Sequence, residues 1–122
     1  MEYKVEYDIN SGVCVVQLSG VHERPQDTQE LFRIAGTVAA EHGCSRFLFD
    51  MREATILGNT MAAYKSVIDH EKYGVSKLFR VAAVYSEITE NEEFLENVVV
   101  NRGARDYKVF DDMLAARDWI AK

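Results

Sequence analysis

Five polar side chains that can take part in chemistry follow one another closely near the middle of the chain: Asp50, Arg52, Thr55, Asn59 and Thr60. They belong to FLFDMREATILGNTMAAY, residues 47–64, which begins as an apolar run and ends with the spacing of an amphipathic helix. Proteins of the α/β class often carry their ligand-binding groups at such strand-to-helix turns. A carboxylate, a guanidinium and two hydroxyls at one turn could bind a charged group of another molecule.

The hydroxyl of Thr60 has the clearest chemical potential in this stretch. Asn59 can cap the following helix, which places Thr60 in the first turn of that helix. The unpaired amides and the positive end of the helix dipole there favour an anion, or a phosphate carried by the hydroxyl. A plainer account also fits, in which Asn59 only caps. In that account Asp50 accepts hydrogen bonds from loop amides, and Arg52 pairs with Asp50 or Glu53.

We expect the loop and helix over residues 50–64 to bind a protein partner and to act as a switch if Thr60 is phosphorylated. The predicted site residues are Asp50, Arg52, Thr55, Asn59, Thr60 and Tyr64.

A small apolar or lipid-like ligand is the competing hypothesis. The second and third predicted helices carry bulky apolar side chains that could line a pocket between them. These side chains are Met61, Tyr64, Ile68, Phe94 and Val98. Apolar stripes at this spacing more often belong to the core of a protein.

Asn101 and Arg102 lie at the end of the third predicted helix, one turn beyond Asn97. The plain interpretation is that Arg102 caps free carbonyls at this helix end. The alternative is that Arg102 reaches a carboxylate on a neighbouring element and anchors the helix there.

Signatures of an enzyme or of a metal site are missing from the sequence. His22, His42 and His70 have no partner at the i, i+4 spacing of a helical metal site, and Cys14 and Cys44 have no zinc spacing. The sequence also contains no GxSxG elbow, and no glycine-rich phosphate loop follows any predicted strand. We therefore expect no enzymatic activity, no cofactor and no metal.

Periodicity and turn residues predict five strands and four helices in the order ββαβαβαβα. The predicted strands are residues 2–9, 13–18, 46–50, 78–85 and 107–110. The predicted helices lie within 25–42, over 59–73, over 90–101 and from 111 or 112 to 120. Asp27 with Glu30, and Thr89 with Glu92, have the spacing of capping boxes.

This order predicts a small α/β fold with a mixed, mostly parallel five-stranded sheet flanked by about four helices. Each strand-helix-strand unit demands a parallel crossover, so the first strand is expected at an edge and antiparallel to the second. That strand carries Tyr3, Val5 and Tyr7 on one face. Because an uncovered edge strand invites pairing, we also expect that the chain can form a homodimer.

Composition narrows the class of protein further. The 122 residues correspond to one domain, and 48% hydrophobic with 28% charged residues is the composition of a soluble globular protein. A net charge of −6 disfavours binding to nucleic acid or to anionic lipid. No apolar stretch is long enough to span a membrane, and the start of the chain does not look like a secretory signal. We expect a cytoplasmic protein without membrane insertion.

With these stretches in hand, the chain resembles the SpoIIAA-like family of STAS/SEC14-type domains over nearly all of its length. The resemblance rests on the element order, on RFLFDMREAT (46–55), and on VAAVYS (81–86) followed by EFLENVVVNRGARDYKVFDDMLAARDWI (93–120). It implies a bacterial, regulatory, non-enzymatic protein with a mixed sheet flanked by helices. An apolar ligand is implied as the alternative, by analogy with SEC14 domains.

The resemblance also bears on Thr60. In anti-sigma-factor antagonists a serine at the start of the second helix, within an Asp-Ser-Ser-Gly type loop, is phosphorylated by a partner kinase. This sequence has Gly58-Asn59-Thr60-Met61 there, and Thr60 alone keeps a hydroxyl.

Overall fold

The alternation of strands and helices in the sequence produces a mixed sheet with helices on both faces. The computed structural model describes residues 1–104 and 106–122. The strands in these residues are β1 (Glu2–Asp8), β2 (Val13–Glu23), β3 (Arg46–Leu57), β4 (Arg80–Val84) and β5 (Asp106–Phe110). The helices are α1 (Gln26–His42), α2 (Thr60–Val67), α3 (His70–Tyr73), α4 (Glu90–Asn101) and α5 (Met113–Ala121).

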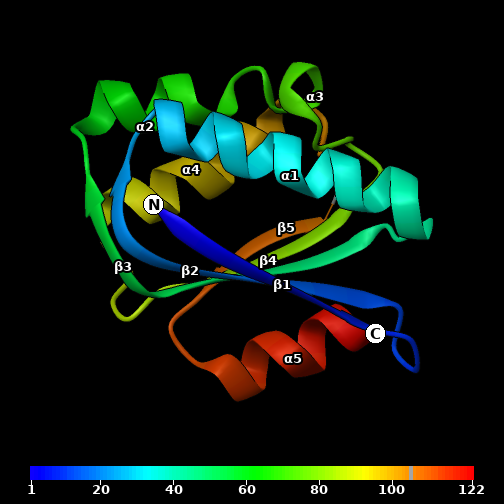
Figure 1. The fold of residues 1–122 in the computed structure, drawn as a ribbon. Coiled ribbons are helices and arrows are strands. Elements are labelled where there is room, and N and C mark those ends of the chain that lie inside the picture. The colour runs from blue at the N-terminus through cyan, green and yellow to red at the C-terminus, as the bar shows by residue number, and fades with distance from the viewer. Residues whose placement is uncertain (105) are drawn as a thin grey trace.

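The strands lie in the sheet in the order in which they occur in the chain, β1-β2-β3-β4-β5. β1 is antiparallel to β2, whereas the pairs β2–β3, β3–β4 and β4–β5 are parallel. Because crossovers are right-handed and each new strand is added on the same side, the crossover helices must share one face. Figure 1 shows α1 to α4 on that face and α5 on the other. The predicted fold class is confirmed.

Most of the predicted helix boundaries are confirmed by their caps. Thr89 and Glu92 form the expected capping box at the start of α4, and Gly43 ends α1 in the left-handed conformation with φ 67°. The capping box expected at Asp27 is wrong, because Asp27 lies inside α1. Its Oδ2 accepts a hydrogen bond from the Glu23 amide at 2.7 Å instead and so ties the end of β2 to the helix.

Strands β2 and β3 are much longer than predicted, and this corrects the interpretation of residues 51–57 as a loop. Residues 19–23 of β2 pair with residues 53–57 of β3 as a two-stranded extension, here called the arm. Residues 54–57 have the alternation of side chains that a strand produces, since Ala54 and Ile56 pack against the core while Thr55 and Leu57 are exposed. The polar residues that suggested a loop occupy the outer face of a strand.

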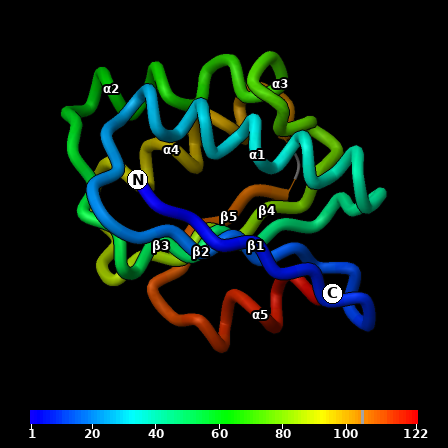
Figure 2. Tube along the Cα trace, in the orientation of Figure 1, coloured from blue at the N-terminus to red at the C-terminus, as the bar shows by residue number. Residues whose placement is uncertain are grey.

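A β-bulge in β3 determines which side chains of the arm face the helices. Gln17 lies opposite Asp50, but Ser19 lies opposite Glu53, so β3 contains one residue more than β2 over this interval. Without that extra residue, Ala54 and Ile56 would point away from the helices. Figure 2 shows β2 and β3 curving out of the sheet toward the start of α2.

The single helix predicted over residues 59–73 is wrong, because α2 and α3 are separate. Asp69 has φ −113° and ψ 36°, outside the helical region, and the chain turns there. The turn allows the buried His70 ring to hydrogen-bond the Val75 carbonyl oxygen, Nδ1 to O 2.8 Å. It also brings Gly74 against α1, where a Cβ on Gly74 would lie 2.5 Å from the Phe32 carbonyl oxygen. The five helices of the described chain therefore exceed the expected four.

The core has one layer on each face of the sheet. The larger layer lies under α1 to α4 and includes Phe32, Phe47, Phe49 and Leu95. The smaller layer lies under α5, where Leu48 of β3 packs with Ile120. Cys14 and Cys44 are free and buried in the larger layer, as expected for small apolar side chains.

Candidate functional site

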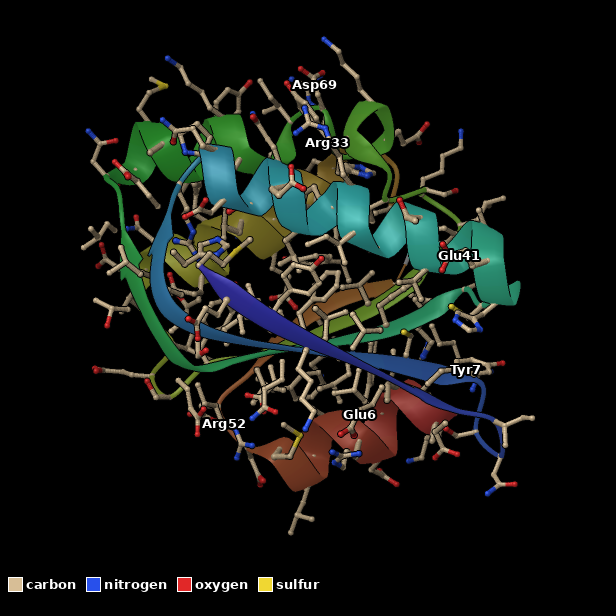
Figure 3. The ribbon with its side chains drawn as sticks, viewed as in Figure 1. Glu6, Tyr7, Arg33, Glu41, Arg52 and Asp69 are labelled. Atoms are coloured by element: carbon tan, nitrogen blue, oxygen red, sulfur yellow. The ribbon has the colours of Figure 1, made fainter. Side chains whose placement is uncertain are left out.

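Asp50 and Arg52 form a local ion pair at the bulge of β3. Arg52 Nε donates to Asp50 Oδ1 and Arg52 Nη2 to Asp50 Oδ2, both at 2.9 Å. Burial raises the pKa of Asp50, but the hydrogen bonds and charge of Arg52 lower it more, so the net pKa is below its usual value. This agrees with the interpretation in which Arg52 only pairs with a neighbouring carboxylate. Figure 3 shows Arg52 on the α5 side of the sheet.

The structure separates the six predicted site residues. Asp50 belongs to the sheet face that α5 covers, as its neighbour Leu48 does. Thr55 lies opposite Val21 on the outer face of the arm, and both are exposed. Thr60 lies in the helix layer. The expectation that these side chains converge in one loop is therefore wrong, since a strand with alternating faces cannot gather them.

Asn59 and Thr60 lie where the sequence placed them. The Asn59 side chain caps α2 by accepting from the Ala62 amide at 2.9 Å. Thr60 is the first residue of α2 and is exposed, and its hydroxyl donates to Asn91 Oδ1 of α4 at 3.1 Å. The Thr60 hydroxyl therefore remains accessible at the contact between the first turns of α2 and α4.

The proposed apolar pocket corresponds to the contact between α2 and α4. The rings of Tyr64 and Phe94 face each other across this contact with centroids 6.2 Å apart. Ile68 and Val98 are half-buried, whereas Met61 is 58% exposed. The larger cavities lined by residues 1–104 and 106–122 lie elsewhere.

Arg102 is an anchor, but its partner differs from the one expected. Arg102 Nη2 donates to the Tyr64 hydroxyl at 3.2 Å and thereby links the end of α4 to α2. A neighbouring element is reached, as the alternative account proposed, but through a hydroxyl rather than a carboxylate. Asn101 is exposed at the end of α4.

A buried ion pair that the sequence did not predict links the arm to the rest of the molecule. Arg24 follows β2 directly, and its Nη1 lies 3.3 Å from Glu92 Oε2 of α4. The exposed fractions of the two side chains are 2% and 8%. Arg24 Nη2 also donates to the Tyr85 hydroxyl at 3.5 Å, and burial raises the pKa of Tyr85. Gly58 permits this closure, since a Cβ there would lie 3.1 Å from the Arg24 Cβ.

His22 lies beside this pair, on the inner face of β2, which extends beyond the strand predicted over residues 13–18. Its Nε2 shares a hydrogen bond with Thr28 Oγ1 at 2.8 Å, and its Nδ1 is buried without a partner among the described residues. Burial, with the nearby Arg24 charge, lowers the pKa of His22 to about 4. The imidazole is therefore neutral near pH 7.

A polar cavity of about 310 Å³ opens above the Arg24–Glu92 pair. It lies between the arm, represented by Ala54 and Ile56, and the loop before α4, represented by Ser86 and Thr89. β4 ends at Val84 whereas β3 continues, so among the described residues no strand pairs with β3 on this side beyond residue 50. The cavity occupies the carboxyl ends of the parallel strands, where ligands bind in open α/β sheets.

Exposed apolar side chains gather at the same end of the molecule. Val21 and Leu57 on the outer face of the arm are 50% and 47% exposed, and Met61 follows in the first turn of α2. Figure 1 shows the arm and the start of α2 together at this end. We call Val21, Thr55, Leu57, Thr60 and Met61 the docking face. Its border is acidic, with exposed Glu23, Glu53 and Glu90.

Little in the sequence could have revealed the buried pair. Glu92 already had a role in the capping box, where a carboxylate ordinarily faces solvent. Arg24 stands before a proline and has no periodic context. Alternation over Val21–Glu23 and Ala54–Leu57 was a usable signal for the arm, and the charged residues near it concealed that signal.

Comparison with solved structures identifies the architecture. The anti-sigma factor antagonist SpoIIAA in its unphosphorylated form is similar over 96% of this chain and 96% of its own, with TM-score 0.57 and 10% identity. The Bacillus cell fate determinant SpoIIAA in its phosphorylated form is similar over 96% and 97%, with TM-score 0.53 and 12% identity. The chain has the SpoIIAA fold. No family model and no curated protein matches the sequence.

The SpoIIAA fold by itself does not assign the functional residues, which have to follow from the geometry of this chain. Within residues 1–104 and 106–122, no group of three His, Cys, Asp or Glu side chains is arranged to hold a metal ion. No helix in the described part of the chain has the length and apolar character needed to cross a bilayer.

Proposed function

We propose that this protein is a non-enzymatic, cytoplasmic regulatory domain that binds a protein partner through the docking face. The observation that carries the proposal is that Leu57 and Met61, which flank the accessible Thr60 in the chain, are both exposed at the end of the arm and the start of α2. Large apolar side chains that are about half exposed at one end of a molecule are typical of interaction sites. The two similar structures compared above are forms of SpoIIAA, which is described as an anti-sigma factor antagonist and as a cell fate determinant.

Charge indicates the chemistry of the partner. Glu23, Glu53 and Glu90 border the docking face, and the whole chain carries −6. A partner that presents apolar side chains surrounded by Lys or Arg therefore complements this face, and its association is steered by the acidic border.

Phosphorylation of Thr60 would control this face. A phosphate adds roughly −1.5 to −2 charge and removes the hydroxyl donor that Asn91 now accepts. Glu90 is the residue before Asn91, so the added charge would repel the first turn of α4. The acidic border would become more negative and the contact between α2 and α4 would change.

The proposal is tested by photo-cross-linking in the source cell. A photoreactive residue replaces Met61 in one variant and Leu114 in a matched control, which is 78% exposed on α5 at the opposite face. We expect a protein adduct from position 61 only, whose binding to the purified domain is lost in Leu57→Asp and altered in Thr60→Glu. Equal adducts from both positions, or none from position 61, would contradict the docking face.

An apolar-ligand carrier is the alternative, and the contact between Tyr64 and Phe94 disfavours it because a ligand between α2 and α4 would have to separate these rings. Native mass spectrometry of freshly purified protein distinguishes the two functions. A lipid-sized adduct that is lost in Phe94→Asp would support the carrier, and a clean mass of the unbound protein supports the interaction domain.

A further inference from the structure

β1 is an edge strand whose outer side is open. In the described chain it pairs with β2 alone, and six of its seven residues are exposed. Figure 1 shows β1 at the front of the sheet, with α1 above it and α5 below. Its outward backbone amides and carbonyls are therefore available to another strand.

The side chains of β1 divide into an apolar and a charged face. Val5 lies opposite the buried Val16, and Tyr7 stacks on His42 of α1 with ring centroids 5.0 Å apart, so the tyrosines and Val5 face α1. Lys4 and Glu6 alternate with them and face the α5 side, where Figure 3 shows Glu6.

The central part of this pattern, Lys4 to Glu6 with the flanking tyrosines, is complementary to itself in one antiparallel register. If a second copy pairs with β1 about a two-fold axis through Val5, Lys4 of each copy lies opposite Glu6 of the other. Tyr3 of each copy then lies opposite Tyr7 of the other on the α1 side. At the two ends of the paired strands Glu2 of each copy lies opposite Asp8 of the other, which offsets part of the gain from the charge pairs. Opposite charges and aromatic pairs directly across two strands stabilise their pairing.

The neighbouring registers that keep the faces matched are disfavoured. An axis through Lys4 places the two Lys4 side chains opposite each other and Glu2 opposite Glu6. An axis through Glu6 places the two Glu6 side chains opposite each other, although it also sets Lys4 opposite Asp8. Each shifted register pairs only five of the seven residues of β1 and loses the Tyr3–Tyr7 pairs, whereas the register centred on Val5 pairs all seven. The length and the aromatic residues of β1 therefore favour the register centred on Val5.

A groove beside β1 offers further apolar surface to the second copy. It has a volume of about 540 Å³ and lies between β1 and α1, lined by Tyr3, Val5, Ile34 and Val38 among others. Arg33 and Glu41 of α1 also border it and place both signs of charge at its edge. A symmetric partner brings its own Tyr7 and α1 to this groove, because two-fold pairing sets the same surface against itself.

We propose that two copies of this chain associate through β1, antiparallel and centred on Val5, to form one continuous sheet with the two α1 grooves covered at the interface. The ligand of this surface is thus a second copy of the chain. The inference is independent of the docking face, which lies on the arm and α2.

Sedimentation equilibrium with reversed charges tests the register. Lys4→Glu sets two pairs of carboxylates against each other, and Glu6→Lys sets two pairs of ammonium groups against each other. Each variant removes two favourable cross-strand pairs and creates two unfavourable ones, and each of these four changes is worth a few tenths of a kcal/mol. We therefore expect the dissociation constant of the dimer to rise roughly tenfold or more. Both positions are exposed, so the fold of the monomer is retained, as circular dichroism would show.

Mixing the two variants gives the decisive result. In a mixed dimer the carboxylates at positions 4 and 6 of the Lys4→Glu chain meet the ammonium groups at positions 6 and 4 of the Glu6→Lys chain, so the mixture should associate more tightly than either variant alone. Lys65→Glu on α2 and Glu71→Lys on α3 are exposed controls with the same charge changes and should associate like wild type. A monomeric wild type, single variants that dimerise like wild type, or a mixture no more associated than its components would each overturn the proposal.

Discussion

Two ion pairs of this protein differ in their separation along the chain, in their burial and in whether the sequence predicts them. Asp50 and Arg52 are two residues apart on β3, and Arg52 is 45% exposed. Arg24 and Glu92 are 68 residues apart, and both side chains are buried. The first pair follows from the local backbone of a strand and was one of the two pairings predicted for Arg52. The second exists only because α4 packs over the end of β2.

The difference in burial leads to a difference in consequence. In the Asp50–Arg52 pair 45% of the guanidinium side chain but only 8% of the carboxylate side chain is exposed, so water screens the guanidinium and reduces what the pair contributes to the free energy of unfolding. A buried pair is strongly destabilising when one partner is removed, because the other charge remains without compensation. Arg24–Glu92 therefore determines whether the arm, and with it the docking face, stays against the rest of the molecule.

The largest effect is expected from Arg24→Met. It leaves the Glu92 carboxylate buried without its cation and should lower the free energy of unfolding by about 3–5 kcal/mol, measured by urea denaturation. Glu92→Gln keeps an oxygen for the capping box with Thr89. The double variant Arg24→Met/Glu92→Gln should therefore recover part of the loss, and a loss below about 1 kcal/mol in Arg24→Met would show that the pair does not hold the arm.

The next largest effect is the pH dependence of the free energy of unfolding, in which His22, beside the Arg24–Glu92 pair, should contribute more than Asp50. The pKa of His22 falls from its ordinary 6.5 to about 4 because the ring is buried. Since the unfolded chain takes up this proton first, stability should decline as the pH falls from about 6.5 to 4, by up to about 3 kcal/mol. Asp50, whose pKa is lowered from 3.8, contributes a loss only below that range.

Urea denaturation at a series of pH values measures this effect. His22→Gln cannot titrate, so its stability should change much less between pH 6.5 and 4 than that of the wild type. The same slope in both proteins would mean that other groups govern acid stability.

The smallest effect is expected from Arg52→Ala. Asp50 keeps a hydrogen bond from the Arg52 amide at 3.2 Å, and the lost guanidinium is nearly half exposed. The free energy of unfolding should fall by only about 0.5–1 kcal/mol, a value typical of partly exposed pairs. A loss as large as that of Arg24→Met would remove the contrast between the two pairs.

The sequence predicted the elements far better than the site. Thr89, Asn59 and Gly43 mark helix ends because caps depend on neighbours within a few residues. The same local reasoning failed at residues 51–57, because charged side chains on the outer face of a strand look like a polar loop. Thr60 was placed correctly at the start of α2, but its contact with Asn91 could not be inferred from residues 31 positions apart.

The sequence by itself determined the order of the elements, the parallel sheet with an antiparallel edge strand, and Asp50 as one of two local partners open to Arg52. These features follow from periodicity, turn residues and handed crossovers, all of which act over short distances along the chain. Only the tertiary structure decided that β2 and β3 extend into an arm, that Arg24 meets Glu92 beneath it, and that the predicted site residues lie on different faces. Those outcomes depend on which surfaces are buried against each other, because burial sets both the direction of each side chain and the strength of its charge interactions.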